Sequence, residues 1–181
     1  MKPILLFSTL NIVAVISAFT LLNANSQTTQ TDKAKVTKKA EMKESARLAI
    51  CQYCFWTGEL KIGAIEGVTE TEAGFMDSRE VTLVKYDPKV TTVAKILKQA
   101  KADGVATGIY LDEPDKLPGS KQFTGYRAAP KHDQKKQIQG TIFANLTLTN
   151  EQATKVNAYA RSNPQKALTY LTPEQIKQLK R

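Results

Sequence analysis

The stretch RLAICQYCFWTGELKIGAI, residues 47–65, decides the fold, because it joins a short strand to a helix through a cysteine pair. Its first four residues are mostly apolar and indicate a strand that leads into Cys51. From Cys54 onward, apolar side chains recur at helical spacing until Gly67 ends the pattern. The chain therefore passes from strand to helix within Cys51-Gln52-Tyr53-Cys54.

The segments that follow alternate between strands and a helix. Residues 68–75 predict a strand, residues 76–79 a turn, and residues 80–86 a second strand rich in β-branched side chains. Apolar residues at helical spacing predict a helix over 91–102, and a further strand is expected within 105–111. The order is that of a split βαβ unit, so we expect an α/β (α+β) fold of the ferredoxin-like type, a two-layer sandwich.

The C-terminal third predicts a loop region followed by short helices. Residues 112–147 are rich in Pro, Gly and polar side chains and complete an expected domain over 44–147. The phrases Thr149-Asn150-Glu151-Gln152 and Thr172-Pro173-Glu174-Gln175 each place a Thr three residues before a Gln, which is a capping box. We therefore expect a C-terminal helical extension over 148–181.

The N-terminus carries a targeting pattern. Lys2 precedes an uncharged apolar stretch over 3–22, and small residues follow at 24–26. This pattern predicts a signal peptide over 1–26, although the stretch also approaches the length of a membrane anchor. Residues 27–43 are polar and predict a flexible tether. In either case we expect an exported protein, which is periplasmic, extracellular or held outside the cytoplasm by a membrane tether.

Composition narrows the function classes. The 181 residues include 41% hydrophobic ones, which suffices for one domain of ordinary size. The formal net charge is +9, but the basic residues are spread along the chain and do not interleave with aromatic ones. The charge therefore indicates a solvated surface rather than nucleic-acid binding, and we expect a monomer.

The cysteine pair predicts a reactive or metal-binding role rather than a stabilising disulfide. A disulfide between Cys51 and Cys54 would close only a very short loop, so it would add little stability. A thiolate at a helix N-terminus is stabilised by unpaired backbone N–H groups, and a neighbouring thiol can capture its sulfenic acid as a disulfide. The spacing alone also fits a thioredoxin-like motif or a site for a soft metal ion.

The residues after the cysteine pair resemble the A-type peptide methionine sulfoxide reductases, over roughly residues 47–100. The resemblance lies in a cysteine-aromatic motif, two glycine-containing turns and an acidic residue seven positions before an Asp-Pro turn. The motifs are Cys54-Phe55-Trp56, Ile65-Glu66-Gly67-Val68, Thr71-Glu72-Ala73-Gly74-Phe75, Glu80-Val81 and Tyr86-Asp87-Pro88.

This resemblance implies a role for five residues. Cys54 matches the nucleophile that attacks the sulfoxide sulfur, and Phe55 and Trp56 match the aromatic groups that hold the methyl group of methionine. Glu80 matches the acid that donates a proton to the sulfoxide oxygen. The segment around Tyr126 loosely resembles a further family motif and makes Tyr126 a candidate second donor. The resemblance implies oxidised methionine, in proteins or free, as substrate, a thioredoxin-like reductant, and no cofactor or metal.

The sequence also departs from the family pattern. Tyr53 stands where the family has Gly, residues 76–79 replace a longer insertion, and Lys121 stands where the family has Asp. The C-terminal resolving cysteines of the family are absent, so Cys51 is the candidate resolving thiol. These changes alter the substrate pocket more than the thiol chemistry.

Other interpretations remain open at this point. Heavy-metal-associated domains share the ferredoxin-like fold and a Cys-x-x-Cys pair, which would suit Cu(I). The chain could also be a non-catalytic relative that makes protein contacts. Taken one at a time, the cysteine pair could be an inert disulfide, Phe55 and Trp56 could be core aromatic residues, and Glu80 could be an exposed strand carboxylate. The single histidine, His132, lies in a polar segment and is expected to be a solvated loop residue.

Overall fold

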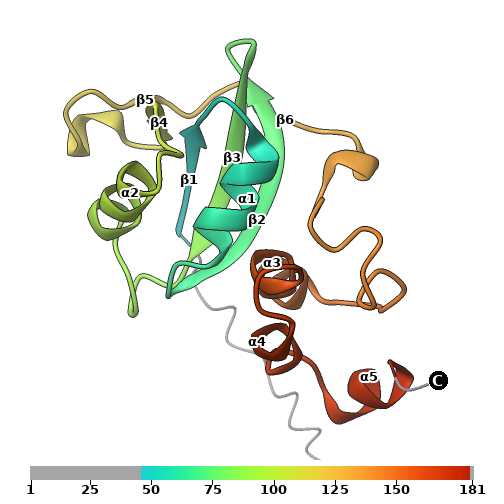
Figure 1. The fold of residues 1–181 in the computed structure, drawn as a ribbon. Helices are drawn as coiled ribbons and strands as arrows, with labels where there is room; N and C mark the ends of the chain where they lie inside the picture. The colour runs from blue at the N-terminus through green and yellow to red at the C-terminus, as the bar shows by residue number, and fades with distance from the viewer. Residues whose placement is uncertain (1–45, 180–181) are drawn as a thin grey trace, which may run out of the picture. The chain divides into compact units, whose positions relative to one another are not determined.

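The computed structural model describes residues 46–179, so the expected signal segment and tether lie outside the described residues. The described chain is a mixed α/β fold with a six-stranded sheet (Figure 1). Its strands are β1 (Ala46–Cys51), β2 (Val68–Met76), β3 (Arg79–Tyr86), β4 (Gly108–Leu111), β5 (Lys121–Gln122) and β6 (Arg127–Ala128). Its α-helices are α1 (Phe55–Gly63), α2 (Val93–Ala102), α3 (Asn150–Tyr159), α4 (Pro164–Leu168) and α5 (Pro173–Gln178). None of these helices is long and apolar enough to span a bilayer.

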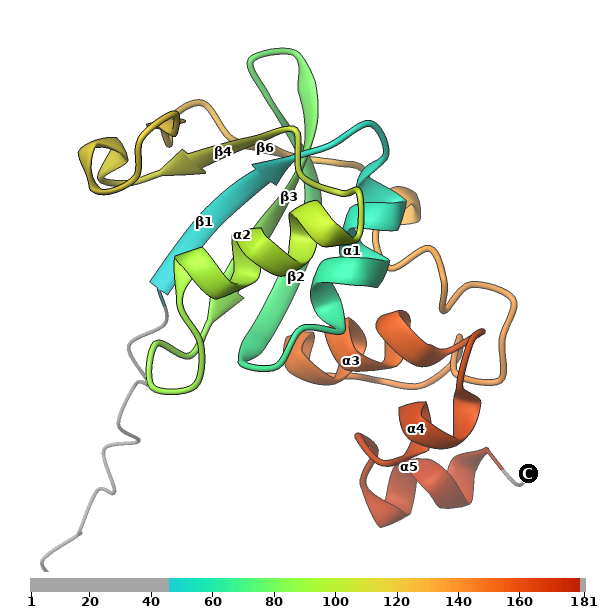
Figure 2. The ribbon, with the colours of Figure 1, turned by 60° about the vertical axis from the view of Figure 1, so that its left-hand side comes forward.

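The sheet has the strand order β5-β4-β1-β3-β2-β6. The pairs β1–β3, β1–β4, β2–β3 and β2–β6 are antiparallel, whereas β4–β5 is parallel. Helices α1 and α2 lie side by side on one face of this sheet, as Figure 2 shows. The predicted α/β class and the predicted order of strands and helices from β1 to β4 are confirmed.

The two faces of the sheet follow from alternation along β1. Leu48 and Ile50 pack with side chains of α1 and α2, and we call this side the helix face. Ala49 and Cys51 point to the opposite side, the far face, because successive side chains of a strand alternate. Burial of the aliphatic side chains on the helix face contributes about 1.5–3 kcal/mol each. The largest fully buried ones there are Leu48, Ile50, Ile62, Val68, Val84 and Ile96.

A tight hairpin sets the register between β2 and β3. Asp77 and Ser78 have φ angles of 48° and 58°, as the two central residues of a type I′ turn require. The turn pairs Met76 with Arg79 and therefore aligns Phe75 opposite Glu80. The predicted turn is confirmed, and it places two residues of the candidate site in one cross-strand row.

Helix α1 approaches β3 closely at Gly58. A Cβ atom on this glycine would lie 2.3 Å from the Thr82 hydroxyl and 2.7 Å from the Gln52 amide nitrogen. These two side chains hydrogen-bond each other over 2.8 Å beneath the helix, so neither moves without breaking that bond. The glycine therefore lets the first turn of α1 lie directly on the sheet.

We expect Gly58→Ala to destabilise the protein by about 1–3 kcal/mol, because the clash requires the helix to shift. In an uncrowded helix the same substitution stabilises the protein by about 1 kcal/mol, so the expected change in stability has the opposite sign here. Urea unfolding followed by circular dichroism measures the difference. Gly108→Ala is the control, since its Cβ would lie 3.5 Å from that of Cys51, an ordinary contact. A stabilised Gly58→Ala variant would contradict the proposed packing.

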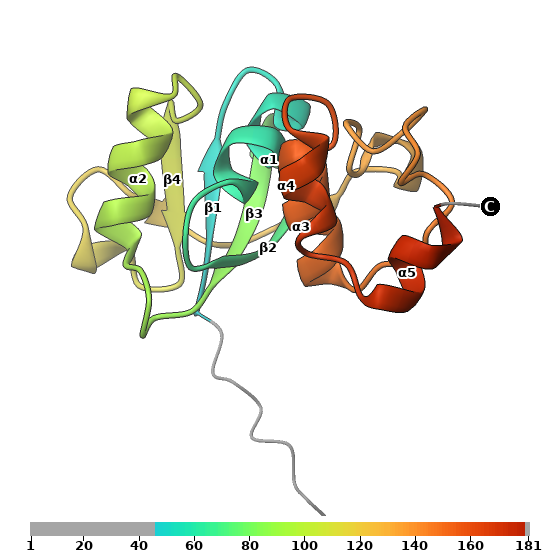
Figure 3. The same cartoon turned by 60° about the horizontal axis from the view of Figure 1, so that its bottom comes forward.

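The C-terminal extension packs against α1 (Figure 3). Both predicted capping boxes are present, at Thr149 and Thr172, and they begin α3 and α5. From α3, the Lys155 ammonium donates hydrogen bonds of 2.9 Å to the carbonyls of Gly63 and Ile65, at the C-terminal end of α1. Burial lowers the pKa of Lys155 to about 8. The extension thus holds the end of α1 that lies away from Cys54.

The expected loop over 112–147 is only partly correct. The segment contains the 3₁₀ turns η1 (Pro114–Lys116) and η2 (Lys131–Asp133), and the short strands β5 and β6 extend the sheet at opposite edges. Helix α4 was not predicted; it begins at Pro164 after an Asn163 cap. His132 lies in η2 with its side chain 78% exposed, as expected of a surface residue.

Candidate functional site

Cys54 is the N-cap residue of α1, as the sequence predicts. Its φ and ψ angles of −149° and 111° are extended, and its carbonyl accepts the first helical hydrogen bond, from Gly58 N–H, over 3.0 Å. The thiol is partly exposed and forms no disulfide. Cys54 thus lies at the N-terminus of α1, where the first N–H groups have no partner within the helix.

Glu80 reaches the same helix end from β3. Its carboxylate accepts a 2.8 Å hydrogen bond from the N–H of Phe55, the residue directly after Cys54. The strands are also joined there by a bond from Gln52 N–H to the Glu80 carbonyl, over 3.2 Å. The first N–H groups of a helix have no partner within the helix, so a carboxyl group at this end can accept from them. The structure therefore brings Cys54 and Glu80, 26 positions apart by number, to one helix end.

Three aromatic side chains form a wall beside this helix end. The Phe55 ring is 6% exposed and contacts the rings of Trp56 and Phe75 edge to face, with centroids 5.9 Å and 5.5 Å away. Ala73 and Ala129 pack against the same cluster. We call Phe55, Trp56 and Phe75 the aromatic wall. The indole N–H of Trp56 is buried and has no hydrogen-bond partner within residues 46–179.

Phe75 is the member of the wall that sequence reasoning missed. It belongs to the glycine-aromatic motif of residues 71–75, for which the resemblance implies no role. The signal was present, because the tight turn at 77–78 aligns Phe75 with Glu80 in the hairpin. A register count from the turn would have placed it beside the acid.

Cys51 does not share the surroundings of Cys54. It is the last residue of β1, is fully buried, and packs on the far face with Ala49, Met76, Val81 and Tyr110. Both cysteines are free thiols in this structure. The two thiols therefore lie in different surroundings, that of Cys51 buried on the far face and that of Cys54 partly exposed at the start of α1.

The proposed placement of Tyr126 as a donor at this site is corrected by the structure. Its ring packs on the far face over Gly74, where a Cβ atom would lie 2.4 Å from the ring. The Tyr126 hydroxyl donates to the Glu72 carboxylate over 2.7 Å. Burial, followed by this hydrogen bond, raises the pKa of Tyr126 above its usual value. The sheet separates Tyr126 from Cys54, because Gly74 faces away from its neighbours Ala73 and Phe75.

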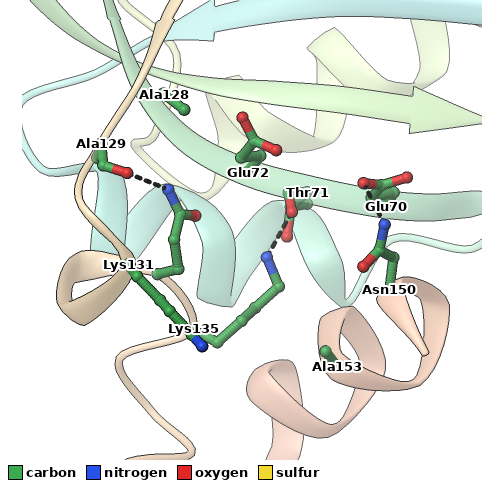
Figure 4. A pocket seen from close by; sticks show the side chains of 10 residues that line it. Glu70, Thr71, Glu72, Ala128, Ala129, Lys131, Lys135, Asn150 and Ala153 are labelled. Atoms are coloured by element: carbon green, nitrogen blue, oxygen red, sulfur yellow. Dashed lines mark hydrogen bonds between the residues drawn. The ribbon is translucent and has the colours of Figure 1, made fainter. Parts of the chain in front are cut away.

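A buried ion pair fixes the segment that borders the wall. Glu59 of α1 is fully buried and accepts from Lys135 twice, from Nζ over 2.5 Å and from the backbone N–H over 2.8 Å. The Lys135 ammonium also donates to the Thr71 carbonyl of β2, a contact that Figure 4 shows. The Gln134 amide exchanges two hydrogen bonds with the backbone of Ala73, of 2.9 Å and 2.8 Å. These side chains thus bond to the edge of β2 next to the short stretch that pairs with β6.

The comparisons with known proteins add no family. No protein-family model matches the chain, and no curated protein matches it significantly. Within residues 46–179, no three or more His, Cys, Asp or Glu side chains cluster as a metal site would require.

Proposed function

We propose that this protein is a thiol oxidoreductase of the methionine sulfoxide reductase type, with Cys54 as nucleophile and Glu80 as acid. One observation carries the proposal: the Glu80 carboxyl group hydrogen-bonds the N–H of Phe55, next to Cys54. A nucleophile at a helix N-terminus with a carboxyl group beside it is the arrangement that sulfoxide reduction needs. Proton donation requires Glu80 to be neutral when the substrate is bound.

The proposal includes a ferredoxin-like core. Strands β1 to β4, with α1 after β1 and α2 after β3, follow the βαββαβ order of that fold. The antiparallel order β4-β1-β3-β2 supports this assignment, as does the position of both helices on one face. In this core the N-terminus of α1 follows the end of the central strand β1, which exposes Cys54 at one end of the sheet.

The Cys54 thiolate attacks the sulfoxide sulfur while Glu80 gives its proton to the sulfoxide oxygen. The oxygen is then transferred to Cys54, so that methionine is released, the sulfur of the substrate is reduced and Cys54 becomes a sulfenic acid. The proton lost by the Cys54 thiol returns Glu80 to its neutral state. The aromatic wall offers an apolar surface for the methyl group of methionine.

Cys51 completes the proposed cycle. Its thiol attacks the Cys54 sulfenic acid, a Cys51–Cys54 disulfide forms, and water leaves. A thioredoxin-like dithiol then reduces the disulfide and is itself oxidised. Because Cys51 is buried on the far face, this step includes a local opening at the end of β1. Oxidised methionine, in proteins or free, is the proposed substrate, and the apolar N-terminal stretch supports export.

We expect the purified protein to reduce the S epimer of peptide methionine sulfoxide with dithiothreitol as reductant and to leave the R epimer unreacted. A rigid wall and a fixed acid can serve only one configuration at sulfur, and the family resemblance implies the S epimer. Chromatography of the methionine formed from each separated epimer measures the rates. Equal rates for both epimers, or no reduction of either, would contradict the proposed function.

A further inference from the structure

A row of three side chains crosses the sheet at the site. Glu80 of β3 pairs with Phe75 of β2, and Phe75 pairs in turn with Arg127 of β6. Paired residues of adjacent strands project to the same side, so all three lie on the helix face. Adjacent strands are about 4.8 Å apart, so the backbones of Glu80 and Arg127 are about 10 Å apart.

Arg127 lies against the aromatic wall and keeps its hydrogen-bond donors free. Its guanidinium carbon is 4.7 Å from the centroid of the Phe75 ring. No carboxylate within the described part of the chain forms an ion pair with it, and Arg127 is exposed. A guanidinium stacked on a ring still presents its N–H groups in the plane, in a fork that matches a carboxylate.

A second cation flanks the wall from the following segment. The Lys136 ammonium is 4.9 Å from the centroid of the Trp56 ring and donates a long hydrogen bond of 3.5 Å to the His132 carbonyl. The nearby acid Asp133 lies 3.4 Å from the His132 ring nitrogen. The apolar surface proposed for the methyl group is thus bordered by two cations, and Arg127 is the one without a polar partner in residues 46–179.

We propose that Arg127 is a specificity-determining residue that selects methionine sulfoxide with a carboxylate close by; this inference rests on the proposed function. With the sulfoxide oxygen at Glu80, a carboxylate on the same or the next residue of the substrate can approach Arg127, because Glu80 and Arg127 lie on one face of the sheet with a single strand between them. The carboxylate has two possible sources: an acidic side chain next to the oxidised methionine, or the α-carboxylate of the substrate. Arg127 does not contact the reacting sulfur, so it acts on binding rather than on the chemical step.

The test compares peptides that contain the S epimer of methionine sulfoxide next to Asp, Asn or Lys, with both termini blocked. At low ionic strength, wild type is expected to show a KM about three- to tenfold lower for the Asp peptide than for the Asn peptide, with kcat unchanged. Arg127→Gln is expected to remove this preference, and Arg127→Lys to keep part of it. Added salt is expected to weaken it.

The control is Lys89→Gln, which removes one exposed positive charge just beyond the end of β3 that lies away from Glu80. It is expected to keep the Asp preference. A second comparison uses N-acetylmethionine sulfoxide, which has a free α-carboxylate, and its methylamide, which has none. A low KM for the first compound alone would assign the α-carboxylate of the substrate as the group that Arg127 binds. Reduction of all peptides with no Arg127-dependent preference, or an equal loss in the Lys89→Gln control, would overturn the inference and leave the proposed function intact. A wild type that reduces no sulfoxide would overturn both.

Discussion

Replacing Glu80 by Gln is expected to slow methionine sulfoxide reduction by about a hundred- to ten-thousandfold, the usual range for the loss of general acid catalysis. Gln keeps the shape of the side chain, and its oxygen can still accept the 2.8 Å hydrogen bond from Phe55 N–H. It has no transferable proton, so the oxygen leaves the substrate sulfur without neutralisation of its charge. The measurement is kcat/KM for the S epimer, with dithiothreitol in excess.

Two controls separate proton delivery from damage to the site. Cys51–Cys54 disulfide formation by a simple oxidant is expected to be nearly unchanged in Glu80→Gln, because that reaction needs no sulfoxide acid. Glu72→Gln makes the same chemical change on the far face, where Glu72 accepts from Tyr126, and its reduction rate is expected to match wild type. If Glu80→Gln reduces methionine sulfoxide at the wild-type rate, Glu80 is only a helix cap.

Replacing Lys135 by Met is expected to cost about 3–5 kcal/mol of unfolding free energy, because it leaves a buried carboxylate without its partner. Glu59 is fully buried, and Lys135 supplies its ionic partner as well as a bond to the Thr71 carbonyl. The change also releases the segment that carries Ala129 and Lys136 to the aromatic wall. Urea unfolding gives the stability, and the fluorescence of Trp56 reports on the wall.

A double variant tests whether the uncompensated charge is the cause. Adding Glu59→Gln to Lys135→Met removes that charge and is expected to restore much of the stability. Lys116→Met is the matched control, since Lys116 forms a 2.7 Å ion pair with Glu113 in which both side chains are about 70% exposed, and it should change little. A Lys135→Met variant as stable as wild type would show that the pair does not hold the segment in solution.

Local patterns predicted the elements from β1 to α2 because each one depends on neighbours in sequence. Cys54 could be predicted as a helix N-cap, and the turn after Met76 as a hairpin, from spacing and turn chemistry alone. The capping boxes at Thr149 and Thr172 were recognisable for the same reason, since their hydrogen bonds span only three residues. These predictions needed no knowledge of the tertiary fold.

The features that were missed depend on contacts between distant segments. Strand β6 is only two residues long, so its pairing with β2 cannot be read from local alternation. The position of Tyr126 on the far face could therefore not be predicted from the sequence. The pair between Glu59 and Lys135 joins residues 76 positions apart. The position of Cys51 on the far face could have been predicted. Leu48 and Ile50 define the helix face, and strand alternation then places Cys51 on the opposite side.

The central claim, that Cys54 takes the oxygen from methionine sulfoxide, is tested most directly by a single turnover without reductant. Fully reduced wild type and Cys51→Ser are each expected to form about one methionine per protein molecule, and Cys54→Ser none. Wild type should end as the Cys51–Cys54 disulfide, and Cys51→Ser as a sulfenic acid that dimedone traps on Cys54. Methionine formation by Cys54→Ser, or none by wild type and Cys51→Ser, would contradict the account.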